Sequence, residues 1–208
     1  MKHDTLTGLA GHVELTAASE AAIQEGRTIA LVLLDVDYFA EINTRYGPEA
    51  GNLVLQGLAA LLKEEGGDNT FRVSGDEFAL LFPGESLEQA FLSAEKLRAR
   101  VEASGPKMNL PAGWKLTITA GVAQFPRDAK NAPGLFHAAA AALMAAKEQG
   151  RNTVALPPNE EMVMKSCYYP ASLTRQLKTL AEKQKIKESV LLREGLSDLL
   201  RKYDKAAA

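Results

Sequence analysis

Two short acidic segments carry the side chains best suited to chemistry. The first, LDVD at residues 34–37, ends an apolar run, and the second, SGDEF at residues 74–78, holds adjacent carboxylates. Carboxylates at the end of one strand and in the bend of a neighbouring hairpin can converge on one point. Hard oxygen ligands of this kind suit Mg²⁺, which also takes waters and phosphate oxygens. Taken singly, each segment also fits a surface turn, in which Asp and Gly are common.

A cationic segment suggests that the acidic clusters belong to a larger binding site. The sequence AKEQGRN at residues 146–152 places Lys147 and Arg151 at the end of a predicted helix. These cations could simply complement the helix dipole, with Gly150 as the residue that ends the helix. Two cations beside two carboxylate clusters are also what a triphosphate–metal complex needs.

The hydrophobic pattern predicts the elements that must position these residues. Helices are expected at residues 13–25, 39–46, 48–62 and 132–149, and another follows a capping box formed by Ser86 and Gln89. Strands are expected at residues 28–35, 70–73, 78–82 and 115–124, with a last one near Val154. Without the extra helices the order is β-α-β-β-α-β, a ferredoxin-like layout with helices on one face of an antiparallel sheet. The predicted fold class is therefore α+β.

Four segments resemble the motifs of the GGDEF family of diguanylate cyclases. They are DTLTGL at residues 4–9, LDVDYFAEINTRYGPEAG at residues 34–51, SGDEF at residues 74–78 and AKEQGRN at residues 146–152. They occur in the family's order and spacing over about 150 residues. The resemblance implies a nucleotidyl-cyclase palm, and a GGDEF-type nucleotide domain is expected over residues 1–156.

The resemblance also implies a metal site and a catalytic pair. Asp35, Asp76 and the backbone carbonyl of Val36 would hold Mg²⁺ or Mn²⁺. Glu77 would sit beside the reacting 3′-hydroxyl and assist its deprotonation, so that Asp76 and Glu77 are the expected catalytic residues. Metal stabilisation of charge on the attacking and leaving oxygens would carry most of the catalysis.

The remaining implied roles concern the nucleotide. Asn43 and Asn52 would read the purine edge, while Lys147 and Arg151 would bind phosphates. The implied reaction condenses two GTP into cyclic di-GMP: a 3′-oxygen attacks the α-phosphorus of a second triphosphate, which is bound in a facing domain. GTP or a related purine nucleotide is therefore the expected small-molecule partner.

The sequence departs from the family pattern at positions that would contact the nucleotide. Ala40 stands where the family usually has a phosphate-contacting lysine, and Thr44 and Pro48 replace an aspartate and a histidine. Asn52 replaces an aspartate that reads guanine, which points to relaxed purine specificity. Ser74 replaces the first glycine of the name motif and adds a side chain where the turn approaches phosphate.

Two functions from different classes therefore stay open. Retention of Asp35, Asp76 and Glu77 favours a diguanylate cyclase. The lost positioning groups, and the lack of a preceding sensory domain, favour an inactive GGDEF domain that acts as the nucleotide sensor of a transcription regulator. The family's product-inhibition motif, Arg-x-x-Asp, appears here as EGGD at residues 65–68, so product feedback at that position is expected to be lost.

The C-terminal segment resembles a ribbon-helix-helix DNA-binding module. The PPN sequence at residues 157–159 opens a linker expected at residues 157–161, and the module is expected at residues 162–208. A strand at residues 162–169 precedes two helices with apolar residues four and three apart: Leu173, Leu177, Leu180, Leu192, Leu196, Leu199 and Tyr203. One strand and two helices cannot bury these stripes, so the module is expected to form a homodimer by pairing strands.

The paired strands of such modules enter the major groove of DNA. Counting back from Pro170 and forward to the second helix, the residues expected to contact double-stranded DNA are Met164, Ser166, Tyr168, Lys187 and Ser189. Residues 157–208 carry ten Lys and Arg against seven Asp and Glu, which fits a polyanionic partner. A dimerising helical hairpin without DNA contact fits the same pattern.

The composition is that of an ordinary globular protein, and we expect a cytoplasmic location and no membrane partner for the following reasons. The longest apolar stretch, residues 138–146, is too short to cross a membrane, and the N-terminus lacks the apolar core of a signal peptide. Cys167 is the only cysteine, which excludes an intramolecular disulfide and fits a reducing compartment.

Overall fold

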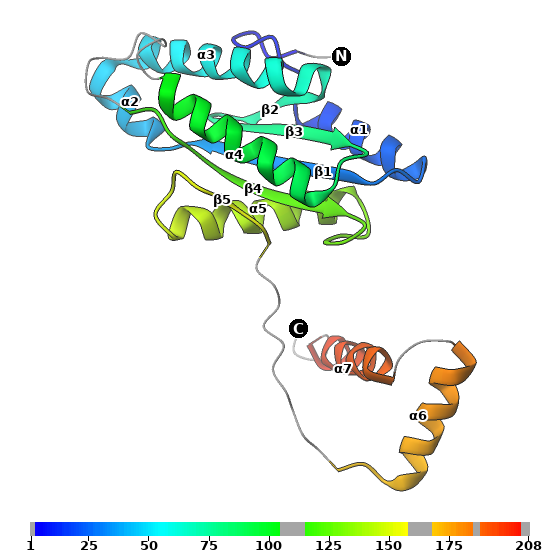
Figure 1. The fold of residues 1–208 in the computed structure, drawn as a ribbon. Coiled ribbons are helices and arrows are strands. Elements are labelled where there is room, and N and C mark those ends of the chain that lie inside the picture. Colours follow the sequence, from blue (N-terminus) through cyan, green and yellow to red (C-terminus); the bar gives the residue numbers. More distant parts are fainter. Residues whose placement is uncertain (1–2, 105–114, 158–167, 185–187, 205–208) are drawn as a thin grey trace. The chain divides into compact units, whose positions relative to one another are not determined.

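The chain divides into two compact units, Met1–Asn159 and Glu160–Ala208. The structure, a computed structural model, describes residues 3–104, 115–157, 168–184 and 188–204 (Figure 1). In these ranges the first unit consists of a sheet with helices on both faces, and the second consists of two helices.

A five-stranded sheet forms the centre of the first unit, with the strand order β2-β3-β1-β4-β5. Strand β1 pairs antiparallel with both β3 and β4, whereas β5 runs parallel to β4. The strands are β1 (Ile29–Val36), β2 (Thr70–Ser74), β3 (Glu77–Pro83), β4 (Ile118–Phe125) and β5 (Val154–Ala155). The order of β1 to β4 is that of the ferredoxin-like layout, so the predicted α+β fold class is confirmed.

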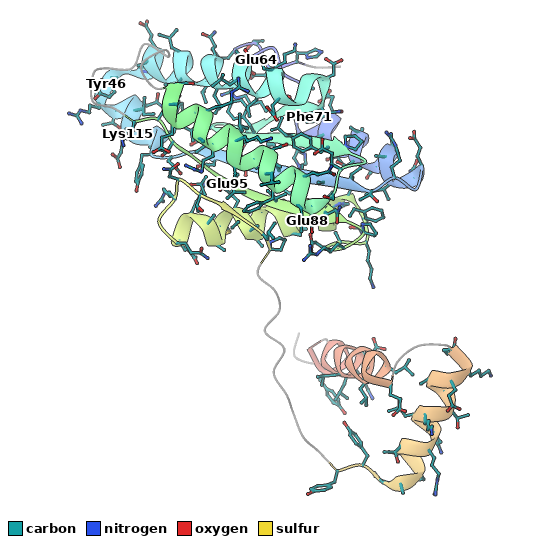
Figure 2. The ribbon with its side chains drawn as sticks, viewed as in Figure 1. Tyr46, Glu64, Phe71, Glu88, Glu95 and Lys115 are labelled. Atoms are coloured by element: carbon teal, nitrogen blue, oxygen red, sulfur yellow. The ribbon has the colours of Figure 1, made fainter. Side chains whose placement is uncertain are left out.

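Helices cover both faces of this sheet (Figure 1). Helices α3 and α4 pack on one face, as the ferredoxin-like layout requires, and the additional helices α1 and α5 pack on the other. Charged side chains such as Glu64 of α3 and Glu88 of α4 lie on the outer surface (Figure 2). The helices of this unit are α1 (His12–Gln24), α2 (Phe39–Tyr46), α3 (Pro48–Gly66), α4 (Leu87–Ser104) and α5 (Ala132–Glu148), and a 3₁₀ turn, η1 (Gly67–Asn69), follows α3.

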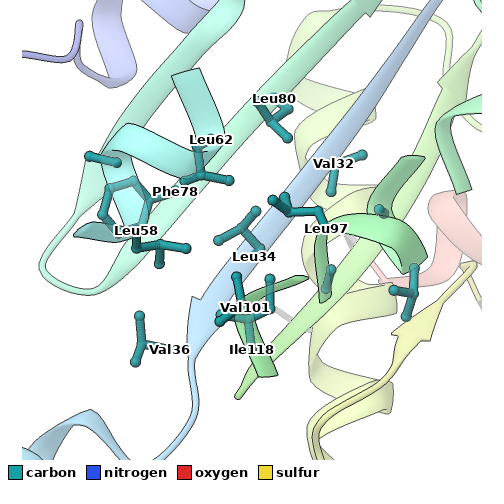
Figure 3. Packing of buried hydrophobic residues seen from close by; sticks show 14 of the residues in the cluster. Val32, Leu34, Val36, Leu58, Leu62, Phe78, Leu80, Leu97, Val101 and Ile118 are labelled. Carbon is teal, nitrogen blue, oxygen red and sulfur yellow. The ribbon is translucent and has the colours of Figure 1, made fainter. Parts of the chain in front are cut away.

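The side chains of β1 alternate between two hydrophobic cores. Leu34 lies in the core beneath α3 and α4, where Leu58 and Leu97 gather around it (Figure 3). Leu31 and Leu33 point to the opposite face and lie in the core beneath α1 and α5. Because successive strand residues face opposite sides, a strand covered on both faces must be apolar almost throughout. This explains the continuous apolar run that precedes the first acidic cluster.

Helix α5 lies unusually close to β4, and a glycine allows this approach. A Cβ atom at Gly121 would fall inside van der Waals contact with the carbonyl oxygen of Ala139 and the backbone nitrogen of Leu143. These are backbone atoms and cannot rotate away, so residue 121 must lack a side chain. The close packing fixes the height of α5 over the sheet and, with it, the position of Lys147 in its last turn.

The predicted boundaries lie within one residue of the observed ones except at α3, which ends at Gly66 and not at residue 62, and at β4. The capping box is present, with the amide of Ser86 donating to Gln89 Oε1 at 2.9 Å and the amide of Gln89 donating to Ser86 Oγ at 3.2 Å. Strand β4 begins at Ile118 and not at residue 115. The backbone at Thr117 pairs instead with the loop after β1, because its carbonyl accepts a hydrogen bond of 3.0 Å from the amide of Asp37.

The second unit contains α6 (Ala171–Gln184) and α7 (Glu188–Asp204). Tyr169, Leu173 and Leu192 help to line an apolar groove between these two helices. Exposed apolar side chains are numerous on this unit: Tyr168, Tyr169, Leu173, Leu180, Leu192, Leu196, Leu199 and Tyr203. The predicted helices are therefore present, and their apolar stripes are largely uncovered within one copy of the chain.

Most of the predicted DNA-contacting residues cannot be compared with the structure. Met164, Ser166 and Lys187 lie outside the described residues, as does most of the strand predicted at residues 162–169. Tyr168 is described and fully exposed, and it belongs to no strand. Ser189 lies in the first turn of α7, as expected, but only its backbone is described.

Candidate active site

Antiparallel pairing brings the two acidic segments together. Asp35, at the end of β1, lies directly opposite Glu77, the first residue of β3. Asp76 occupies the turn just before Glu77, and its carbonyl accepts a hydrogen bond of 3.3 Å from the amide of Val36. The residues predicted for the metal site and for catalysis thus come from adjacent points on two paired strands.

One ammonium group, that of Lys147, lies beside these carboxylates and contacts Asp35. Lys147, in the last turn of α5, lies with its Nζ 2.9 Å from Asp35 Oδ2. Both side chains are partly buried, with 32% of Lys147 and 16% of Asp35 exposed. Among the residues that the structure describes, one ammonium group thus faces a cluster of three carboxylates, which leaves excess negative charge in a partly desolvated position.

Burial and the neighbouring negative charges raise the pKa of two of the carboxyl groups. Burial raises the pKa of Asp35, and the nearby Asp76 raises it further, while the hydrogen bond from Lys147 opposes the rise. Burial likewise raises the pKa of Glu77, with a further contribution from the negative charge of Asp35. Desolvation and like charges both disfavour the ionised form, so the site gains stability when a cation enters it.

The carboxylates form an incomplete cation site, in which other ligands must complete the coordination of a metal ion. No group of three or more His, Cys, Asp and Glu side chains in the described ranges is already arranged to enclose a metal ion. Two carboxylates and a backbone carbonyl match the coordination preferences of Mg²⁺. This ion usually binds through one or two carboxylates and completes its shell with waters and substrate phosphates.

The residues predicted to read the base lie on α2 and α3, which follow β1. Asn43 is half-buried on α2, and its amide lies against Gly51 of α3. A Cβ atom at residue 51 would overlap Asn43 Oδ1 and lie 3.1 Å from Phe39 Cζ, so this glycine leaves room for the amide. Asn52 follows in α3 and is exposed. The two asparagines thus belong to neighbouring helices.

The altered positions of α2 do not supply a substitute for the missing lysine. The Thr44 hydroxyl donates to the carbonyl of Ala40 at 2.8 Å, so it is engaged within the helix. Ala40 and Thr44 line a groove together with Glu41 and Arg45.

A long-range contact fixes the hairpin turn that carries Asp76. Asp4 accepts hydrogen bonds from the amide and hydroxyl of Thr7 and from Arg72 Nη1, the last at 2.8 Å. Arg72 in turn donates through Nε and Nη2 to the carbonyl of Gly75, at 3.0 and 2.6 Å. Burial alone would raise the pKa of Asp4, but the hydrogen bonds from Thr7 and Arg72 lower it to about 2. The N-terminal motif therefore acts on the site through Arg72, which the sequence pattern did not single out.

The second aspartate of the LDVD segment is not part of the carboxylate cluster. Asp37 is buried and accepts hydrogen bonds from the Thr117 and Thr119 hydroxyls, at 2.7 and 2.6 Å, and from the amide of Asn152, at 3.0 Å. The neighbouring Arg151 lies over the ring of Tyr38, with its guanidinium carbon 5.0 Å from the ring centre. A local sequence pattern gives no signal for these partners, because they lie about 80 residues or more away along the chain.

Comparison with known proteins identifies two family matches. Residues 1–153 match the model of the diguanylate cyclase GGDEF domain, and residues 166–204 match that of a ribbon-helix-helix domain. Diguanylate cyclase A of Treponema denticola is 31% identical in an alignment of 166 residues that covers 76% of this chain and 42% of that protein. An uncharacterized membrane protein of Staphylococcus aureus is 34% identical over 76% of this chain and 46% of its own length.

The chain thus spans less than half the length of these curated relatives. Within the part of the chain that is described, no helix is long and apolar enough to cross a membrane.

Solved structures lead to the same family. The GGDEF domain of DgcB from Caulobacter crescentus, in complex with c-di-GMP, superposes with a TM-score of 0.69 at 27% identity, covering 76% of this chain and 93% of that one. The active GGEEF domain of a diguanylate cyclase from Vibrio cholerae gives a TM-score of 0.66 at 26% identity, covering 73% and 99% of the two chains. This chain belongs to the GGDEF family of diguanylate cyclase domains, and it carries a ribbon-helix-helix domain at its C-terminus.

Proposed function

We propose that this protein is a diguanylate cyclase that condenses two GTP molecules into cyclic di-GMP. The observation that carries the proposal is the pairing of Asp35 with Glu77 across β1 and β3, with Asp76 in the adjoining turn and Lys147 at 2.9 Å from Asp35. The similarity to a protein named diguanylate cyclase A supports the same reaction class.

Each residue of the cluster has a distinct task in this reaction. Asp35, Asp76 and the carbonyl of Val36 would hold Mg²⁺ or Mn²⁺, which would supply positive charge to the reacting phosphate and hydroxyl oxygens. Glu77 accepts the proton of the 3′-hydroxyl, and its raised pKa brings it closer to the working range of a general base. Lys147 keeps an ammonium group in the site for the phosphates.

The chemistry is a nucleotidyl transfer carried out twice. The 3′-oxygen of one GTP forms a bond to the α-phosphorus of the other, and the bond from that phosphorus to the bridging oxygen of pyrophosphate breaks. The proton leaves to Glu77. Repetition by the second 3′-hydroxyl closes the ring and releases a second pyrophosphate. Because each nucleotide is held by one domain, two copies must face each other.

The C-terminal unit would supply this pairing by forming a homodimer. Exposed leucines on both α6 and α7, among them Leu173, Leu196 and Leu199, leave each helix with an uncovered apolar stripe. Such stripes gain stability when a second copy covers them. The residues 157–161 would then act as a short linker between the nucleotide domain and the dimer.

The absence of several side chains that would contact the nucleotide favours a second function. Ala40 and Pro48 supply no side-chain contact to a phosphate, and the Thr44 hydroxyl is engaged within α2. A GGDEF domain that binds without turnover would serve as the nucleotide sensor of a DNA-binding protein. In that case the paired tails would contact DNA through Met164, Ser166, Tyr168, Lys187 and Ser189.

The first test separates these two functions. Purified protein incubated with GTP and Mg²⁺ should yield cyclic di-GMP, detected by mass spectrometry. Asp76→Asn removes a charged ligand at almost constant size, so turnover should fall by more than the roughly 10- to 100-fold typical for an outer-shell partner of a metal site. Asp68→Asn, the same change in η1, should leave turnover unchanged. Binding of Mg²⁺–GTP without any product would favour the sensor, and equal turnover of the Asp76 variant and the parent would overturn the metal assignment.

A second prediction concerns the electrostatic cost of placing these carboxylates close together. Since the pKa of Glu77 is raised in the folded state above its ordinary 4.5, the folded chain binds more protons than the unfolded chain, and stability falls as pH rises through and above that value. In EDTA at pH 7.5, Glu77→Gln should therefore unfold at a higher urea concentration than the parent, and this gain should shrink below pH 4.5. Glu88→Gln, at an exposed site on α4, should bring no gain. An unchanged or lower midpoint for Glu77→Gln at pH 7.5 would refute the electrostatic argument.

A third prediction concerns the base. An aspartate at position 52 could accept from both guanine N1–H and the 2-amino group, whereas Asn52 offers one acceptor and one donor group. The parent should therefore discriminate weakly between GTP and ATP, and Asn52→Asp should sharpen guanine preference by roughly 10- to 100-fold, the value of a charge-assisted hydrogen bond. Competition binding of the two nucleotides measures this, with Asn69→Asp as a control. Equal selectivity before and after the Asn52 change would remove residue 52 from base reading.

The last prediction concerns the tail. Truncation after Leu156 should yield a monomer whose initial rate per chain rises with protein concentration, because two free domains must meet. The full chain should stay dimeric on dilution through its tail. Its rate per chain should then change little with concentration, since the short linker holds the two nucleotide domains at an effective concentration on the order of millimolar. Light scattering and initial rates across a dilution series test both statements. A full-length chain that runs as a monomer would contradict the dimer and its coupling to turnover.

A further inference from the structure

The loop after α5 has an unusual backbone that requires an explanation. Gly150, Arg151 and Asn152 follow one another with φ values of 118°, 64° and 45°. Glycine adopts such values at little cost and asparagine tolerates them, but Arg151 is disfavoured there. Consecutive residues persist in this conformation only when their surroundings hold them, and such strain gathers at functional sites.

The first anchor of this loop is Asp37. The amide of Asn152 donates at 3.0 Å to Asp37 Oδ2 and at 3.0 Å to Thr119 Oγ1. Asp37 is itself 3% exposed, and the Thr117 and Thr119 hydroxyls complete its contacts. The Asn152 side chain also accepts a hydrogen bond of 2.9 Å from Arg98 Nη1 of α4. The loop is therefore tied to the sheet and to α4.

The second anchor is Tyr38, which directly follows Asp37. Its ring lies under the guanidinium of Arg151, with the guanidinium carbon 5.0 Å from the ring centre. Tyr38 also has a positive φ, 57°, and its side chain is about half exposed. A guanidinium held over an aromatic ring loses freedom of movement but spends no N–H donor on that contact, so its donors stay available for bidentate binding of phosphate.

These contacts form a series along two short segments. Asp35 contacts Lys147, Tyr38 contacts Arg151, and Asp37 contacts Asn152. The exit of β1 is thus joined to the end of α5 and the following loop at three points. The first point lies inside the carboxylate cluster, and the other two orient the second cation predicted to bind phosphate.

We propose that Asp37 and Tyr38 are positioning residues for the triphosphate of the bound nucleotide, with Asp37 locking the loop of residues 150–152 and Tyr38 aiming the Arg151 guanidinium at the phosphates. The inference rests on the proposed function, because it takes a purine nucleoside triphosphate as the ligand. A role in folding alone would require the loop to be held but would not require an aromatic ring under the arginine.

The test measures binding of Mg²⁺ with a non-hydrolysable GTP analogue, and separately of GMP, to the full chain by calorimetry. Tyr38→Ala should weaken binding of the triphosphate by about 2- to 5-fold, the range expected for a cation–π contact at an exposed site, and should change GMP binding much less. Tyr38→Phe retains the ring and should restore the parent affinity. The double variant Tyr38→Ala with Arg151→Ala should bind no more weakly than Arg151→Ala alone. Tyr38 acts through Arg151, so its loss has no further effect once the guanidinium is gone.

Asp37→Asn is the matched change at the first anchor and should also weaken binding of the triphosphate selectively. Should that variant not fold, the three Tyr38 variants decide the question alone. Triphosphate binding by Tyr38→Ala equal to that of the parent, or full additivity with Arg151→Ala, would overturn the positioning role while leaving the proposed function intact. A parent that binds neither nucleotide would overturn the proposed function and this inference with it.

Discussion

The structure depends on the antiparallel pairing of β1 with β3, which sets Asp35 against Glu77. Like charges directly opposite each other weaken a sheet, so local electrostatics alone would not select this register. The register is set instead by the apolar residues of β1, which fill the cores on both faces of the sheet. Packing thus imposes an unfavourable charge cluster, and Lys147 relieves it only in part. Conflicts of this kind between local preference and fold are expected at functional sites.

The cations of the site depend on packing far from it. Gly121 lets α5 rest on β4, which sets the height of Lys147 over the end of β1. The loop that follows is held by Asp37, whose hydrogen-bond donors come from the chain just before β4, from β4 itself and from the loop. The turn bearing Asp76 is fixed from the other side by Arg72 and Asp4. Distant segments therefore converge on one small volume, and a change in any of them can alter the charge geometry.

The sequence predicted those features that have a local signature. Strand alternation, the capping box at Ser86 and the order of elements follow from short-range patterns, and they led to the correct fold class. The pairing of Asp4 with Arg72 spans 68 residues and leaves no periodic trace. Asp37 likewise resembles Asp35 in sequence, and only the hydroxyls of Thr117 and Thr119 distinguish a buried acceptor from a cluster member. Tertiary partners, and not composition, decide such roles.

The central claim is that the carboxylates around the β1–β3 pair hold a divalent cation together with the phosphates of a nucleotide. Crystals grown with Mn²⁺ and a non-hydrolysable GTP analogue test it directly, because Mn²⁺ is located by its anomalous scattering. The expected result is an anomalous peak in contact with Asp35, Asp76 and phosphate oxygens, with Arg151 still lying over the ring of Tyr38. A nucleotide bound elsewhere, or bound at this place with no peak near Asp35, would contradict the account.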